Sequence, residues 1–152
     1  MSKVFEDKFS ELQADMVSIC LEYVENRADE VYIYCSYEGN SITCNFFYRI
    51  NGKVVKKHKL NDVIDKSESF QYDTSAERQD GVLDIINEDI EKMGKLCEEY
   101  SRDMPTEIKL IYNVANNSLK ADYRYDMVRS KDTDKIGYDI YLEWFEEVNS
   151  NM

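Results

Sequence analysis

The sequence predicts an α+β fold in which an antiparallel sheet of about five strands is packed by two long helices and a short C-terminal helix. The first signal lies in residues 31–60, where two kinds of side chain alternate with a period of two and turn residues separate three strands. Two long segments, residues 5–24 and 76–102, repeat apolar residues three and four positions apart, as amphipathic helices do. Two further alternating stretches follow the second of these segments.

The chain is expected to form one domain spanning residues 1–152. Hydrophobic residues make up 43% of the sequence, and a chain of this length buries roughly 70% of its unfolded surface. One proline, five glycines and the lack of a repeat or low-complexity linker leave no point at which to divide it.

The first helix is predicted over residues 5–24, where charged residues separate the apolar positions. Its apolar side should cover one face of the sheet. The three strands that follow are expected at residues 31–37, 42–50 and 53–59. Asn51 and Gly52 join the last two, because these residue types most easily take the positive φ of a type I′ hairpin turn.

Residues 61–75 have no sustained period and are rich in Asp, Ser and Asn, so an irregular loop is predicted there. The second helix should follow over residues 76–102, with Thr74 as its N-cap and Glu77 reaching back in a capping box. Asp89 interrupts the apolar face of this helix. The helix is expected to end before Pro105, because a proline disfavours helical geometry in the residue that precedes it.

Two more strands, residues 106–113 and 119–126, and a short helix at residues 138–148 complete the predicted fold. The helix carries an apolar stripe that includes Trp144, the one tryptophan of the chain, and core packing is the preferred interpretation of that stripe. The side chains expected to be mostly buried are Phe9, Leu12, Met16, Ile33, Phe46, Ile86, Met93, Leu110 and Trp144.

Net charge is the strongest compositional signal, since 31 acidic and 19 basic residues give −12 and a sequence pI near 4.5. Phosphate backbones would be repelled, so direct nucleic-acid binding is not expected. The acidity can serve solubility alone, or it can serve a basic protein partner through complementary potentials. No run approaches the ~18 apolar residues of a membrane span, and no signal peptide is apparent, so a cytoplasmic protein without membrane contact is expected.

Neither a metal site nor a cofactor is expected. The four cysteines fall on predicted apolar faces without a C-x-x-C pair, which favours reduced core residues: Cys20, Cys35, Cys44 and Cys97. Residues 132–143 match an EF-hand loop at positions 1, 3, 6 and 12, but Ile136 offers no side-chain oxygen at position 5 and Asp139 replaces the apolar residue of position 8. A chance match in an acidic segment is therefore expected.

The sequence is not expected to encode an enzyme. It has no phosphate-binding or nucleophile motif, and its single histidine, His58, lies between two lysines on a strand predicted to be an edge, where it should face solvent. No nucleophile, base and oxyanion donor can be assembled from the motifs present. A carboxylate-based hydrolase stays as the enzymatic alternative, and an acidic adaptor or chaperone for another basic protein as the non-enzymatic one.

Four short stretches and the order of the elements carry a family resemblance. The stretches are Glu30-Val31-Tyr32, Phe46-Phe47-Tyr48, Pro105-Thr106, and residues 119–125 with the pair Asp122-Tyr123. In these features the chain resembles the YezG-like immunity proteins, the family that includes EsaG. The resemblance implies a cytoplasmic antitoxin that binds and neutralises a nuclease toxin delivered by type VII secretion.

If the partner is a nuclease, its active-site cleft must be cationic, and an acidic protein can cover that cleft by placing carboxylates where phosphates would bind. Acids on loops and edges near aromatic residues are the best candidates, because aromatic anchors inside a charged rim dominate interface energies. Packing of the sheet by these tyrosines is the competing interpretation. The candidate partner-binding residues are Tyr123, Tyr125, Asp126, Asp132, Asp134, Tyr138 and Asp139, with Glu98 and Glu99 as a second patch.

Overall fold

The computed structural model of the chain describes residues 2–38, 41–64, 67, 69–125 and 137–150. Its elements follow one another as α1 (Ser2–Tyr23), β1 (Glu30–Glu38), β2 (Ser41–Ile50), β3 (Lys53–Lys56), η1 (Leu60–Val63), α2 (Ala76–Glu99), β4 (Glu107–Asn113), β5 (Ser118–Arg124) and α3 (Gly137–Ser150). The five strands form one sheet in the order β3-β2-β1-β4-β5, and all neighbouring pairs are antiparallel. The predicted α+β class, with two long helices and a short C-terminal one, is confirmed.

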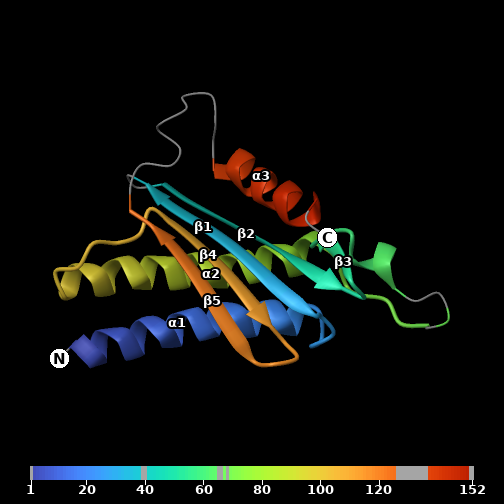
Figure 1. The fold of residues 1–152 in the computed structure, drawn as a ribbon, viewed down its shortest axis with the longest axis horizontal. Helices are drawn as coiled ribbons and strands as arrows, with labels where there is room; N and C mark the ends of the chain where they lie inside the picture. Colours follow the sequence, from blue (N-terminus) through green and yellow to red (C-terminus); the bar gives the residue numbers. More distant parts are fainter. Residues whose placement is uncertain (1, 39–40, 65–66, 68, 126–136, 151–152) are drawn as a thin grey trace.

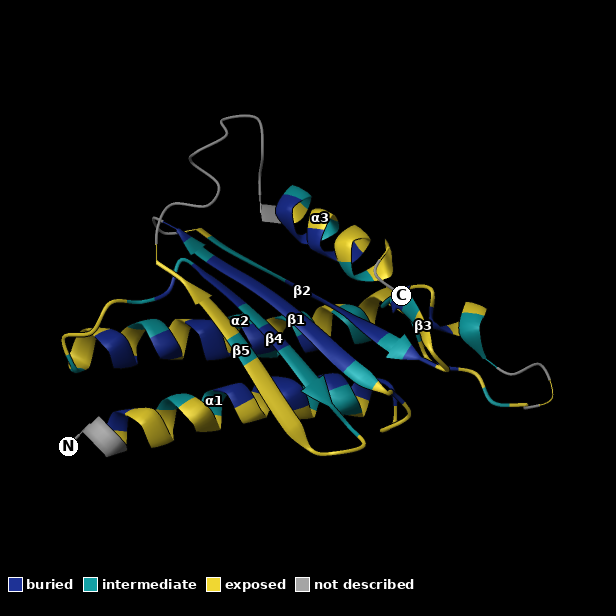
Figure 2. Ribbon diagram, viewed as in Figure 1, coloured by how far each residue is buried: buried dark blue, intermediate teal, exposed yellow. Residues whose placement is uncertain are grey.

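The sheet separates two helical layers (Figure 1). Alternate residues of β1 point to opposite faces, so that Val31 and Ile33 pack into the core with α1 and α2, whereas Tyr32 and Tyr34 pack against α3. β1 and β2 are therefore covered on both faces, while β5, at the edge, is largely exposed (Figure 2). None of the described helices is long and apolar enough to cross a lipid bilayer.

The larger core lies between the sheet and the pair α1 and α2. Seven of the nine side chains predicted to be buried are so. Phe9 and Leu12 are the exceptions, because they are half-buried and pack at the margin of the core. Both lie on the N-terminal half of α1 and also pack against the small cluster of Phe5, Leu96 and Cys97, at the margin between α1 and α2.

The smaller core holds α3 on the other face of the sheet. The rings of Tyr32 and Phe47 stack at 4.6 Å between centroids, and Trp144 meets Phe47 edge-on at 5.2 Å. The Tyr141 hydroxyl donates a 3.0 Å hydrogen bond to the backbone carbonyl of Phe46. The core-packing interpretation of the stripe around Trp144 is confirmed.

The hairpin between β2 and β3 forms as predicted. Asn51 and Gly52 have φ values of 53° and 77°, as a type I′ turn requires, and the Asp29 carboxyl accepts a 3.0 Å hydrogen bond from the Gly52 amide. The third strand is shorter than predicted, because the chain turns at Lys56 and the one-turn helix η1 buries Leu60. The predicted irregular loop therefore begins with a short helix.

Both ends of α2 differ from the prediction. Ser75, not Thr74, is the N-cap, and its hydroxyl accepts a 3.3 Å hydrogen bond from the Arg78 amide. The helix ends at Glu99 instead of residue 102, because Ser101 takes a left-handed φ of 55°. The Ser101 amide then bonds to the Glu98 carbonyl and the Arg102 amide to the Cys97 carbonyl, which together form a Schellman motif.

The fifth strand also stops early, at Arg124, so Tyr125 follows the strand instead of extending it. The Arg124 carbonyl accepts a 2.7 Å hydrogen bond from the Thr106 amide, just before β4 begins. This contact fixes the end of β5 beside the connection between α2 and β4.

Candidate partner-binding surface

The exposed tyrosines at the end of β5 lie against the N-terminal part of α1. Tyr123 and Tyr125 are 38% and 58% exposed, and both line a cavity of about 250 Å³. The Gln13 side chain donates a hydrogen bond to the Tyr123 hydroxyl, and the Phe9 ring meets Tyr123 edge-on at 6.0 Å. Burial, followed by proximity to Tyr123, raises the pKa of Tyr125. Tyr123 thus has one side packed and one side open to a partner.

The predicted second patch lies on the last turn of α2. Glu98 and Glu99 are both exposed, and that turn carries no basic residue. The C-terminus of a helix has a partial negative charge, so two carboxylates there are unfavourable for the isolated protein. A cationic partner would remove this cost.

Tyr138 and Asp139 lie elsewhere, on the first turn of α3 and hence on the opposite side of the sheet from α1. Tyr138 is 47% exposed, and its ring lies 6.0 Å from that of Tyr141. The sheet therefore divides the described members of the candidate set into two groups. Asp126, Asp132 and Asp134 lie outside the described residues, as do residues 132–136 of the stretch that resembles an EF-hand loop.

The sequence interpretation did not single out the acidic surface that the outer sides of α1 and α2 form. Among the described residues of these two helices, the exposed bases are Lys8, Lys92 and Lys95. The exposed acids are Glu6, Asp7, Glu11, Asp15, Glu22, Glu77, Asp80, Asp84, Glu88, Glu91, Glu98 and Glu99. We call these residues the helical acidic surface. The sequence does indicate this surface, because the acids of both helices lie opposite the apolar stripe of each helix.

A groove of about 580 Å³ lies between α1 and α2. Its lining combines the apolar side chains of Leu12 and Leu96 with Asp15, Asp89 and a rim of charged residues. Asp89 is 2% exposed, and among the described residues its Oδ2 has no hydrogen-bond partner. Burial, followed by a hydrogen bond with Asp15, raises the pKa of Asp89 to about 7.

A second buried acid lies on the α3 side of the sheet. Glu107 is 2% exposed and accepts a 2.8 Å hydrogen bond from the Tyr34 hydroxyl, while Lys109 Nζ lies 3.8 Å from its other oxygen. The Lys109 ammonium group is 5.5 Å from the Trp144 ring centroid. Glu107 thus has partners within the sheet, one in β1 and one in β4.

The histidine and the cysteines are the other side chains that could take part in chemistry. His58 is exposed, as predicted, and partial desolvation followed by the adjacent lysines lowers its pKa. All four cysteines are free thiols; three are buried and Cys44 is half-buried opposite Cys35 on the neighbouring strand. In the part of the chain that the structure describes, no three His, Cys, Asp or Glu side chains are grouped to hold a metal ion.

Comparison with known proteins gives no family for this chain: no family model matches it, and no curated protein matches it either.

Proposed function

We propose that this protein is an immunity protein, an antitoxin that binds a secreted nuclease toxin and neutralises it through the helical acidic surface. The observation that carries the proposal is the concentration of exposed acids on one side of the molecule, where Lys8, Lys92 and Lys95 are the exposed bases among the described residues. A nuclease cleft is cationic because it binds a polyanion, so its potential is complementary to this surface. The family resemblance of the sequence supports a nuclease as the partner.

The placement of these acids also suits inhibition by occupation of a cleft. Carboxylates on two neighbouring helices have an already ordered backbone, so binding restricts their side chains but not their main chain. Electrostatic attraction of this kind speeds association and weakens as salt screens it. Rapid capture would suit an antitoxin, since a nuclease damages the cell before a slow inhibitor can bind.

The competing enzymatic function rests on one observation, the close approach of Asp15 and Asp89. A carboxyl pair of this kind can serve in acid and base catalysis. The groove around it, however, is lined by leucine, lysine and glutamate side chains, and its exposed acids belong to the helical acidic surface. We therefore propose a binding role for this groove and for the protein as a whole.

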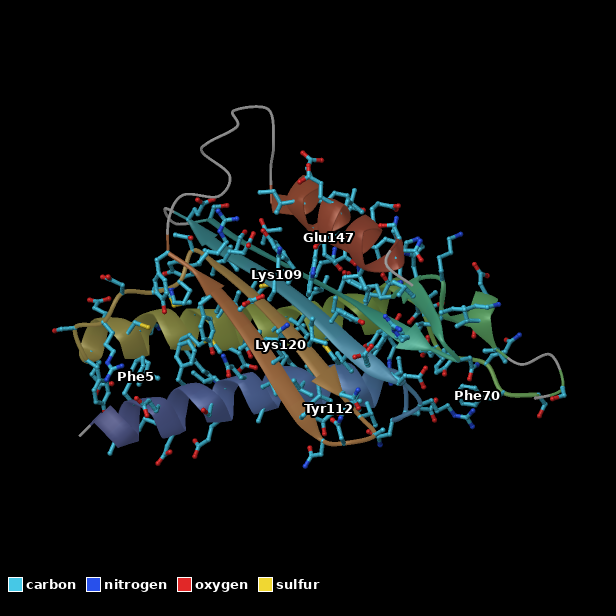
Figure 3. All side chains as sticks on the ribbon, viewed as in Figure 1. Phe5, Phe70, Lys109, Tyr112, Lys120 and Glu147 are labelled. Carbon is cyan, nitrogen blue, oxygen red and sulfur yellow. The ribbon has the colours of Figure 1, made fainter. Side chains whose placement is uncertain are left out.

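The decisive experiment measures neutralisation with two matched charge reversals. Glu98→Lys with Glu99→Lys changes an adjacent pair on α2, and Glu146→Lys with Glu147→Lys makes the same change on α3. Glu147 lies on the far side of the sheet (Figure 3), and all four residues are exposed. The partner tested is the product of the neighbouring gene, assayed for plasmid cleavage and for binding by calorimetric titration at low and high salt.

We expect the α2 variant to bind roughly tenfold or more weakly at low salt, because two attractive charges become repulsive. The α3 variant should keep its affinity. Equal losses in both variants, or an affinity that does not change with salt, would contradict the helical acidic surface. Charge reversal at Asp126, Asp132 and Asp134 tests the predicted loop acids in the same assay.

The adaptor alternative is distinguished by the activity of the partner. An adaptor or chaperone would bind a basic protein in a salt-dependent way and leave its catalytic activity unchanged. An antitoxin must abolish plasmid cleavage at one-to-one stoichiometry. Binding without inhibition would therefore favour the adaptor over the immunity function.

A further inference from the structure

The groove between α1 and α2 contains a buried acid whose hydrogen-bonding capacity is not used within the described structure. Asp89 comes from α2 and lies at the floor of the groove, while Asp15 comes from α1 and is exposed. After burial, interaction with the Asp15 side chain is the next largest cause of the raised pKa of Asp89. The second oxygen of Asp89, Oδ2, has no partner among the described residues. A buried polar atom without a partner destabilises the folded state, so an oxygen retained in this position needs an explanation.

A positively charged group is the natural ligand for this arrangement. Two neighbouring carboxyl groups repel each other when both are ionised, and a cation between them converts that repulsion into attraction. The described residues offer no three-ligand cluster for a metal ion, so an organic cation fits better than a metal. The groove also continues into the helical acidic surface, since Glu99 and Glu11 lie on its rim.

The apolar part of the groove selects among organic cations. Leu12 and Leu96 provide apolar contact for an aliphatic chain that leads to the charged group. Arginine fits the acidic part better than lysine, because its planar guanidinium group forms paired hydrogen bonds with carboxylates and is more weakly hydrated than an ammonium group. Three lysines on the rim, Lys8, Lys92 and Lys95, are too few to neutralise the acids around them.

We propose that this groove receives an arginine side chain of the basic partner, with its stem on Leu12 and Leu96 and its guanidinium group bound by Asp15 and Asp89. The proposal rests on the proposed function for the identity of the partner. It adds the energetic centre of the interface, because a buried charged pair surrounded by a rim that excludes water is typical of a binding hot spot. The other acids of the helical acidic surface then steer the partner toward this point.

Proton release should accompany binding. The titratable groups that act on Asp89 are Asp15 from α1, Glu88 and Lys92 from α2, and the neutral thiol of Cys35 from β1. Their combined effect, with burial, leaves Asp89 partly protonated near neutral pH. A guanidinium group favours the ionised form, so arginine binding should release a proton and tighten as pH rises.

The test uses the full chain and three capped tripeptides whose central residue is arginine, lysine or citrulline, flanked by alanine. Citrulline matches arginine in shape and lacks its charge. Binding is followed by amide chemical-shift titration in the wild type, in Asp89→Asn, and in Glu146→Gln as the matched control. Glu146 is exposed on α3, outside the helical acidic surface, and its substitution changes the charge by the same amount.

We expect the arginine peptide to shift the amide signals of Leu12 and Leu96 and to bind on the order of tenfold more tightly than the citrulline peptide. Asp89→Asn should lose that preference, and Glu146→Gln should keep it. Affinity in the wild type should rise from about pH 6 to about pH 8, and in Asp89→Asn it should stay constant. If Asp89→Asn fails to fold, Asp15→Asn and the citrulline comparison test the same contacts.

Equal affinity for arginine and citrulline, or an Asp89→Asn variant that binds as the wild type does, would overturn the proposal. Equal affinity for arginine and lysine would overturn the assignment of the guanidinium group. The peptide titration needs no toxin, so its failure leaves the neutralisation assay as an independent measure of the proposed function. Conversely, arginine binding in the absence of neutralisation would support the groove and refute the antitoxin.

Discussion

The Tyr34 hydroxyl in β1 donates a 2.8 Å hydrogen bond to the buried carboxyl group of Glu107 in β4, and the two residues lie diagonally across the pair of strands. Burial, followed by the neighbouring Glu107, raises the pKa of Tyr34, so the phenol stays protonated as a donor. This hydrogen bond connects the central strand to the β4-β5 hairpin on the face that α3 does not fully cover.

Tyr34→Phe should lower the free energy of unfolding by ~1–3 kcal/mol, because it leaves a buried carboxyl group with Lys109 as its remaining polar neighbour. Urea denaturation measures the change. Tyr112→Phe is the matched control, since the Tyr112 hydroxyl bonds to Asn117 at an exposed position. Equal effects of the two substitutions would show that the Tyr34 bond makes no special contribution.

The pH dependence of stability should report Asp89. Its pKa is 3.8 in the unfolded chain and about 7 in the folded protein, so the folded state keeps a proton that the unfolded state releases between these values. The contribution to stability is fully present below 3.8 and is lost as the pH rises through about 7. In Asp89→Asn the free energy of unfolding should decrease less as the pH rises. At alkaline pH the variant should be as stable as the wild type, or more so. A wild-type stability that stays constant across this range, measured by urea denaturation, would refute the assignment.

Two glycine substitutions should have opposite effects on stability. Gly52→Ala places a side chain at a φ of 77° in the β2-β3 turn and should lower the free energy of unfolding by ~1–2 kcal/mol. Gly81→Ala lies within α2, where no atom would be within 4 Å of the new Cβ, and should raise it by ~0.5–1 kcal/mol. Thermal unfolding of the two variants measures both changes in stability. If both substitutions stabilise the protein, or both destabilise it, the assigned backbone conformations are wrong.

Trp144→Ala should loosen α3 from the sheet, because the Trp144 ring contacts both Tyr32 and Phe47. The expected loss is ~3–5 kcal/mol of unfolding free energy, with faster amide hydrogen exchange in α3 than in α1 and α2. Tyr138→Ala serves as the control, since that residue is on the same helix and is 47% exposed. Uniformly faster exchange throughout the protein would indicate instead that α3 unfolds together with the rest.

The sequence predicted the secondary structure well wherever periodicity and burial agree. In β1 and β2 the two faces carry different side chains, and the turn at Asn51 and Gly52 has one low-energy geometry, so the strands and their register follow. The end of α2 could not be predicted in the same way, because Ser101 takes a left-handed conformation that sequence patterns assign to glycine.

The candidate site was harder to predict, because it depends on which side of the sheet each helix covers. The exposed tyrosines Tyr123 and Tyr138 lie close in sequence, yet the sheet separates them, since Tyr123 faces α1 and Tyr138 belongs to α3. The break that Asp89 makes in an apolar stripe was visible in the sequence. That Asp89 lies beside Asp15 could not be predicted, because Asp15 belongs to the other helix and no local sequence pattern shows how the two helices pack.

The strand order has a consequence for how the chain folds. The β1-β2 and β2-β3 pairs, like the β4-β5 pair, join neighbours in sequence and can form early as hairpins. The β1-β4 pair alone brings distant segments of the sheet together, with β2, β3 and α2 in the intervening loop. Closing a loop of that length costs entropy before its contacts form. The docking of the β4-β5 hairpin against the three-stranded unit β1-β2-β3 should therefore limit the folding rate. Substitutions at the β1-β4 seam would then slow folding, while those in β3 would mainly speed unfolding.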